Sequence, residues 1–229
     1  MRNIRKPVVI LMACGLCICC RNAFATTYNV SLDTTSLVGH PAGPFYLYLV
    51  LTDGNGVGDG NNTITMSSIS FGGGSPLGSP VLFGGAAGSL EAGLSIVDNS
   101  FLSLFSQQFA PGLGLAFSLN LTSNDDLGGT PDRFTLFVLD SFGVPLPTLA
   151  PAGDYFLGVD LNSGGGTFDN WASDPARAPS VGNPVAIPTP AVNPVPEPDN
   201  LCIGTGLLAI ALVLIRSRHT PTRPSRTRD

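Results

Sequence analysis

Three observations predict that the central part of this 229-residue chain is all-β, an antiparallel β-sandwich of jelly-roll-like type. Large apolar residues alternate with small or polar ones in many short runs, which is the period of a strand with one buried face. Clusters of Gly, Asn, Asp and Pro separate these runs, as turns separate antiparallel strands. No convincing amphipathic helix interrupts them. About eight to ten short strands at this spacing are typical of a sandwich.

The clearest strand is residues 113–121, where large apolar side chains at every second position would all face the interior. These side chains are Leu113, Leu115, Phe117, Leu119 and Leu121. The runs 45–51 and 134–139 are apolar on both faces, which predicts central strands. Residues 101–109 fit a strand and also a helical stripe, so one or two helical turns are an alternative there. The other predicted strands are 28–32, 63–71, 81–83, 94–97 and 155–161.

Residues 1–25 have the three parts of a secretory signal peptide. A basic start is followed by an apolar stretch, residues 7–20, and then by Ala23 and Ala25 in a small-x-small cleavage site. We expect the mature chain to begin near Thr26. The alternatives are an uncleaved signal anchor and a lipoprotein acylated at Cys14. Apart from Cys202, every cysteine lies in this segment, so the exported domain, residues 26–174, is expected to have no disulfide.

A second apolar run, residues 201–215, is uncharged and is followed at once by Arg216 and Arg218. As a helix it would be ~22 Å long, and flanking residues and local thinning let it span the ~30 Å hydrocarbon core. The positive-inside rule places the basic tail, residues 219–229, in the cytoplasm and the central domain outside. A buried core helix is the alternative, but this run has no polar face.

The four residues Val195, Pro196, Glu197 and Pro198 stand directly before this predicted helix. With the helix and the Arg cluster, residues 195–218 resemble the PEP-CTERM sorting signal of exported proteins in Gram-negative bacteria. That resemblance implies a partner, an exosortase-type membrane cysteine peptidase, which would cut near the Pro-Glu-Pro element. The prolines also favour extended backbone, the form in which a peptidase binds its substrate. Residues 175–194 are Pro-rich and predict a semi-extended stalk.

The central domain resembles, more loosely, a group of PEP-CTERM proteins of undefined activity. The shared elements are the turn-rich segments 58–63, 71–74 and 129–132. This resemblance implies no catalytic residues for the chain.

Charge excludes several functions. Between Asp33 and Glu197 the chain has two basic and fourteen acidic residues, a net charge of −12. A nucleic-acid partner is excluded because phosphate backbones need a basic surface. The absence of Lys from Thr26 onward also excludes a P-loop NTPase and Schiff-base chemistry.

The residues of the central domain do not predict an enzyme. His40 is its only histidine, so a multi-histidine zinc site is excluded, and no nucleophile elbow accompanies it. We interpret His40 as a surface residue. Glu91 is the only glutamate of the globular part, and the aspartates that a glycosidase would need are explained as turn residues. These aspartates are Asp98, Asp125, Asp126 and Asp132.

One loop, residues 53–62, has the character of a ligand site. Oxygen ligands at Asp53, Asn55 and Asp59 resemble the start of a calcium loop, although Val57 and Ile64 break the EF-hand pattern. A looser Ca²⁺ site is therefore one interpretation, and a Gly-rich hairpin loop without any cofactor is the other.

The sequence thus predicts a non-enzymatic exported protein of the cell surface or extracellular matrix, associated with exopolysaccharide or the envelope. A precursor would be inserted in the inner membrane before processing. The alternative is a carbohydrate-binding sandwich whose loops 53–62 and 123–132 form the binding rim. Trp171 would either stack on a sugar or close the core.

Overall fold

The computed structural model describes residues 25–54, 56, 58–122, 124, 129–162 and 165–196. The predicted signal peptide, apart from Ala25, and the predicted membrane helix 201–215 lie outside these residues, as does the tail 219–229. So do the predicted site residues Ala23, Asn55, Glu197, Pro198, Arg216 and Arg218. Within the described part of the chain, no helix is long and apolar enough to cross a membrane.

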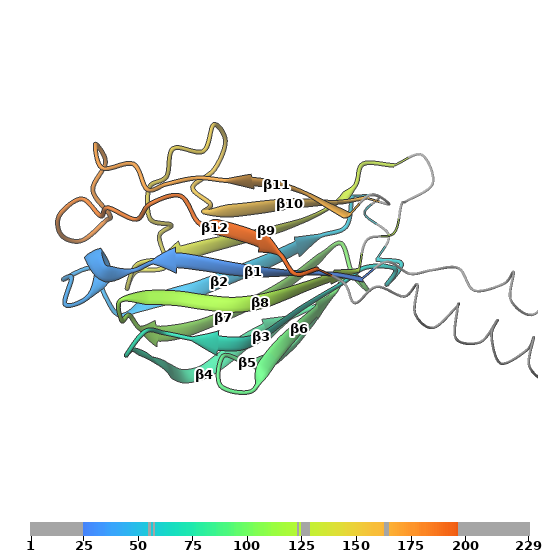
Figure 1. Cartoon of the computed structure of the whole chain (residues 1–229), viewed down its shortest axis with the longest axis horizontal. Helices are drawn as coiled ribbons and strands as arrows, with labels where there is room; N and C mark the ends of the chain where they lie inside the picture. Colours follow the sequence, from blue (N-terminus) through green and yellow to red (C-terminus); the bar gives the residue numbers. More distant parts are fainter. Residues whose placement is uncertain are drawn as a thin grey trace, which may run out of the picture. The chain divides into compact units, whose positions relative to one another are not determined.

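The strands form two antiparallel sheets of six strands each (Figure 1). The first, here called the β1 sheet, has the order β12 (Ala191–Pro194), β1 (Ala25–Asp33), β8 (Gly114–Thr122), β3 (Thr63–Ser70), β6 (Gly93–Val97) and β5 (Gly85–Ser89). The second, the β2 sheet, has the order β11 (Gly165–Asn170), β10 (Leu157–Asn162), β9 (Asp132–Leu139), β2 (Phe45–Thr52), β7 (Leu102–Ala110) and β4 (Ser75–Phe83). One short 3₁₀ helix, η1 (Thr35–Leu37), follows β1. The prediction of an all-β, antiparallel fold is confirmed.

The inner faces of the two sheets share one hydrophobic core, built from the alternation that the sequence shows. On β8, the side chains from Leu115 to Leu121 at every second position are buried. Leu113 is the exception to the prediction, because it precedes the strand and is 67% exposed. Its N–H donates to the carbonyl of Gly72, which fixes it in the turn before β8.

The central placement of residues 45–51 and 134–139 is confirmed, since β2 and β9 are neighbours in the middle of their sheet. The helical alternative for residues 101–109 is wrong: β7 pairs along its length with β2 and β4. The run 155–161 is shorter as a strand than predicted, because β10 begins only at Leu157.

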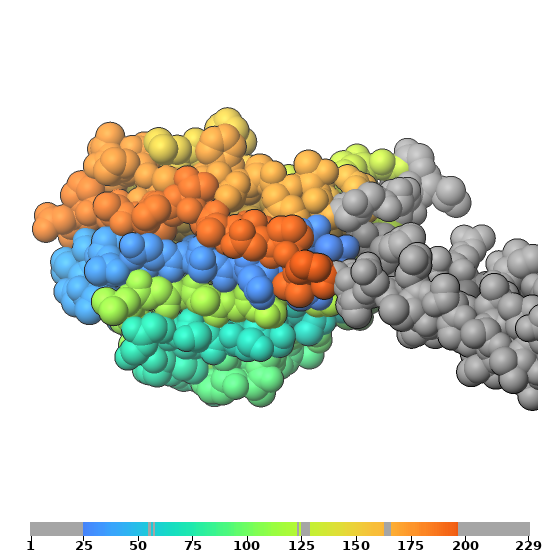
Figure 2. All heavy atoms as spheres, in the orientation of Figure 1, coloured from blue at the N-terminus to red at the C-terminus, as the bar shows by residue number. Residues whose placement is uncertain are grey.

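The predicted stalk, residues 175–194, is instead part of the folded domain. Val185 and Ile187 are each only 2% exposed and belong to the core, and β12 pairs with β1, beside which it lies on the surface in Figure 2. The hydroxyl of Ser173 donates to the Val185 carbonyl at 2.8 Å and accepts the Ile187 N–H at 2.7 Å. Proline content predicts extended backbone but says nothing of whether that backbone is covered, and the apolar residues between the prolines bring about its burial.

Candidate functional site

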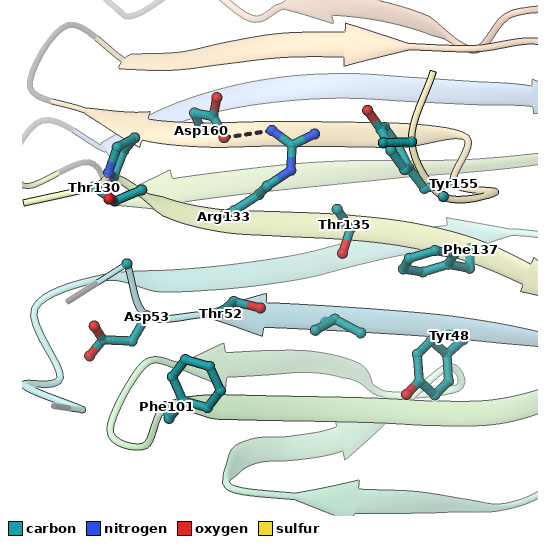
Figure 3. Close-up of a pocket in the computed structure, with 15 residues that line it drawn as sticks. Tyr48, Thr52, Asp53, Phe101, Thr130, Arg133, Thr135, Phe137, Tyr155 and Asp160 are labelled. Carbon is teal, nitrogen blue, oxygen red and sulfur yellow. Dashed lines mark hydrogen bonds and ion pairs between the residues drawn. The ribbon is translucent and has the colours of Figure 1, made fainter. Parts of the chain in front are cut away.

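A groove of about 820 Å³ lies on the outer face of the β2 sheet, where β2 and β9 run side by side (Figure 3). Every second residue of these strands is buried in the core, so the residues between them must point outward. The outward side chains on the groove floor are Tyr48, Val50 and Thr52 from β2 and Arg133, Thr135 and Phe137 from β9.

The register of the two strands arranges these side chains in pairs. Tyr48 lies opposite Phe137, and the pairing continues along the strands until Thr52 lies opposite Arg133. Side chains directly opposite each other on one sheet face are close enough to interact. The floor therefore changes from aromatic at one end to charged at the other, as Figure 3 shows.

The aromatic end is a row of three rings. The Tyr48 and Phe137 ring centroids are 5.8 Å apart and those of Phe137 and Tyr155 are 6.2 Å apart, both in edge-to-face orientation. Tyr155 comes from the segment before β10, and its hydroxyl donates to Asp169 at 2.6 Å. Burial raises the pKa of both tyrosines, so at neutral pH each keeps its proton as a hydrogen-bond donor.

At the charged end, the guanidinium of Arg133 binds two carboxylates. Its Nη1 donates to Asp160 at 2.6 Å, and its Nη2 donates to Asp169 at 2.9 Å. The same guanidinium lies 5.3 Å from the centre of the Tyr155 ring. Burial alone would lower the Arg133 pKa, but its hydrogen bonds to the two carboxylates outweigh that effect, so its pKa is raised.

Gly158 of β10 makes this network sterically feasible. Arg133 starts on β9 and reaches Asp169 on β11, so its side chain must pass over the strand between them. A Cβ at position 158 would collide with the Arg133 guanidinium and the Asp169 carboxylate. The missing side chain therefore leaves room for the ion pairs.

Two of the predicted calcium ligands, Asp53 and Asp59, accept hydrogen bonds from their own loop. Asp53 accepts the backbone N–H groups of Gly56 and Gly58, at 2.6 and 2.5 Å. Asp59 accepts two bonds from Asn61, one from its backbone and one from its side chain. Such contacts are typical of turn-forming aspartates. Among the described residues, no group of three or more His, Cys, Asp or Glu side chains is placed to hold a metal ion.

Asp98 and Asp132 were predicted to be turn residues, but the structure buries them together beside this loop. Asp132 accepts the Gly54 N–H at 2.9 Å and the Asn62 side-chain amide at 2.8 Å, so both of its oxygens have donors. Asp98 accepts the Asn62 N–H at 3.0 Å through one oxygen. Burial, and then the hydrogen bond with Asp132, raises the pKa of Asp98 to about 7. Asp98 therefore takes up a proton at a higher pH than an ordinary aspartate does.

The other residues considered from the sequence lie apart from the groove. The Nδ1 atom of His40 accepts the Ala42 N–H, which leaves Nε2 to donate to the Asn183 carbonyl at 2.8 Å. Glu91 accepts two hydrogen bonds from the Gln107 side chain. Trp171 is half-buried, so its burial alone does not distinguish stacking on a sugar from closing the core.

Sequence reasoning missed the central residues of the groove, although it predicted β2 and β9. Four of the predicted rim positions do line the groove: Asp53, Gly54, Thr130 and Pro131. The available signal was the aromatic character of outward positions in strands that the sequence placed correctly. Comparison of the chain with family models, curated proteins and solved structures gives no match, so the groove is interpreted from its own geometry.

Proposed function

We propose that this chain is an exported, non-enzymatic protein of the bacterial surface or extracellular matrix, and that its β-sandwich binds extracellular polysaccharide in the groove. The observation that carries the proposal is the pair of half-buried rings of Tyr48 and Phe137 on an outer sheet face, with the Tyr155 ring, only 7% exposed, packed behind Phe137. Aromatic side chains contribute most to folding when they are in the core, so the two partly exposed rings on this face favour a binding role.

The chemistry of the groove matches that of a sugar chain. A pyranose ring has apolar C–H faces and a rim of hydroxyl groups, so it needs both flat apolar surface and hydrogen-bonding partners. The rings of Tyr48 and Phe137 offer the first, and the Thr52, Thr135 and Arg133 side chains offer the second. A volume of about 820 Å³ lies within the ~300–1,000 Å³ common for small-molecule sites.

The strand order supports a jelly-roll-like sandwich. The runs β1-β8-β3-β6 and β2-β7-β4 lie in opposite sheets, with β9, β10 and β11 added beyond β2 and β12 added beyond β1. Lectin domains are among the proteins with double-sheet jelly rolls. Because one fold serves many functions, this topology is secondary support and the groove chemistry comes first.

The proposed localisation is based on the N-terminal and C-terminal segments of the chain. A signal peptide, residues 1–25, would direct export, and residues 195–218 would be processed by an exosortase-type peptidase. Replacing Arg216 and Arg218 with Asp, in a host that has such a peptidase, should leave export intact and block maturation, because helix orientation depends on cytoplasmic positive charge. Intact-mass analysis measures both cleavages, and normal maturation of this variant would contradict the proposed signal.

Polysaccharide binding is tested on the full-length protein in detergent, by isothermal titration against a panel of soluble polysaccharides. Tyr48→Ala should weaken binding about tenfold, which corresponds to ~1.4 kcal/mol of lost stacking. The matched control is Asn120→Ala, which truncates an outward side chain on β8 of the opposite sheet and should change nothing. Equal effects of the two variants, or no binding to any polysaccharide, would refute the proposal.

A further inference from the structure

We infer that the groove selects uncharged polysaccharides and rejects acidic ones, because Asp160 and Asp169 neutralise its single cation. This inference rests on the proposed function, since it names the class of polysaccharide that the same groove binds. A basic residue in a sugar-binding groove would ordinarily indicate an acidic ligand, so the partners of Arg133 decide the class.

Carboxylates outnumber cations in and around the groove. Among the described residues that line it, Arg133 is the sole basic one, whereas Asp53 and Asp160 both contribute carboxylates. Asp169 adds a third beside the guanidinium. An acidic sugar placed against Arg133 would therefore be repelled by nearby fixed carboxylates, and these carboxylates already bind the guanidinium that the sugar would need.

The pairing of Arg133 is built into the fold rather than a chance surface contact. The guanidinium crosses β10 at Gly158, where a side chain would block it, and Tyr155 fixes Asp169 from the other side. Burial would raise the Asp169 pKa, but the hydrogen bonds from Tyr155 and Arg133 outweigh it, and the pKa is lowered. Asp169 therefore stays ionised at neutral pH and keeps its hold on Arg133.

The network can still bind neutral hydroxyl groups. Guanidinium has five N–H donors, and carboxylates accept several hydrogen bonds each, so the ion pairs do not use all of the groups present. The side chains of Arg133, Asp160 and Asp169 are each about a third exposed, at 34%, 38% and 36%. Sugar hydroxyls can therefore donate to the carboxylates and accept from the guanidinium without bringing a charge.

The charge of the whole domain acts in the same direction. The net charge of −12 between Asp33 and Glu197 creates a negative field that slows the approach of any polyanion. Long-range repulsion of this kind weakens when salt is added, whereas stacking and neutral hydrogen bonds change little.

The first test uses the full-length protein and four probes of stated charge. Dextran and galactomannan are neutral, and polygalacturonate and alginate are anionic. We expect binding to a neutral probe with an affinity that changes less than about twofold between roughly 0.02 and 0.5 M NaCl, and no binding to either anionic probe. Tight, salt-sensitive binding of an anionic probe would overturn the inference and leave the proposed function standing.

The second test removes the neutralising carboxylates. The double variant Asp160→Asn with Asp169→Asn leaves Arg133 without a counter-charge, so it should gain at least about tenfold in affinity for polygalacturonate, and salt should abolish the gain. The matched control is Asp154→Asn with Asp174→Asn, which removes both carboxylates from Arg177, a residue that does not line the groove. This control should gain nothing.

Thermal unfolding first shows whether each double variant is folded. A folded groove variant that gains no affinity for polygalacturonate overturns the role given to Asp160 and Asp169. If that variant does not fold, the salt dependence of the unmodified protein decides the question. Failure of every probe to bind would instead refute the proposed function and the inference with it.

Discussion

The two sheets have similar inner faces and different outer faces. Both inner faces are lined by Leu, Ile, Val and Phe in one continuous core. On the β1 sheet, the outward residues of β1 and β8 are small or polar: Thr27, Asn29, Ser31, Ala116, Ser118 and Asn120. On the β2 sheet, the outward residues of β2 and β9 are mainly large: Tyr46, Tyr48, Val50, Arg133 and Phe137.

This difference separates what folding requires from what it leaves free. Inner residues are apolar because burying them drives the sheets together. On the outer face of the β1 sheet, small polar residues are sufficient, for example where Ser118 bonds to Asn29. The outer face of the β2 sheet has larger aromatic side chains than this, and that difference is the support for the binding site proposed above.

The largest expected effect compares two neighbours on β8, one on each face. Phe117→Ala should reduce the free energy of unfolding by about 3 to 5 kcal/mol, because Phe117 is buried and its removal leaves a cavity. Ser118→Asp should change it by less than about 0.5 kcal/mol. Urea denaturation measures both, and equal losses would mean that the two faces of this sheet do not differ.

The second test concerns a buried residue from the Pro-rich segment. Ile187→Ala should cost about 2 to 5 kcal/mol, as for an inner residue of a strand, because Ile187 is buried in the core. The control is Val144→Ala, at an exposed position. If Ile187 belonged to a free stalk, both substitutions would leave the unfolding midpoint unchanged.

The third test uses Asp98, which is buried near Asp132. The folded-state pKa of Asp98 is about 7 and its ordinary value is 3.8, so between these values the folded state binds a proton that the unfolded state lacks. Stability should therefore be greatest below pH ~4 for this group and fall by about 1.4 kcal/mol per pH unit up to pH ~7.

Asp98→Asn should remove that slope and stabilise the protein at pH 8, because a side-chain amide donates to Asp132 without a bound proton. Asp59→Asn, in the exposed part of the neighbouring loop, should flatten the slope only slightly, because the charge of Asp59 is the smallest of the causes that raise the Asp98 pKa. Unfolding curves between pH 4 and 8 measure the effect. An unchanged slope in the Asp98 variant would show that Asp98 does not cause the pH dependence.

The smallest expected effect is on the stability of the groove itself. Asp160→Asn should change the free energy of unfolding by less than about 1 kcal/mol, because the ion pair is partly exposed and Arg133 keeps Asp169. A larger loss would mean that the charged end of the groove is needed for folding, and the contrast between the outer faces would then lose its functional meaning. Thermal unfolding of this variant beside Asn120→Ala provides the measurement.

The sequence predicted those strands whose side chains alternate strongly. β8, β2 and β9 follow from their apolar periods, because each of them must bury one face. The strands β5, β11 and β12 were not predicted, since their sequences GAAGS, GGTFDN and AVNP show no such alternation. All three lie at sheet edges, where hydrogen bonding to a single neighbour defines the strand and little side-chain burial is required.

The groove could not be predicted from linear spacing because it depends on register. Arg133, Asp160 and Asp169 come from three different strands, and only the pairing of those strands brings them together. The burial of Asp132 was within reach of the sequence, because it shares the inward period of Phe134 and Leu136. Because aspartate is common in turns, Asp132 was assigned to a turn and this alternation was overlooked.

The pairing of β1 with β12 has a further consequence for how the domain can be rearranged. Tyr28 lies opposite Pro194, and the Val195 N–H donates to the Thr27 carbonyl at 2.8 Å, so the first and last strands of the domain meet at the same end. Neighbouring ends are what circular permutation and insertion into a host protein require. A short linker from Val195 to Ala25 would close the chain into a ring, and new ends opened at the exposed turn around Gly143 would leave every strand pair intact.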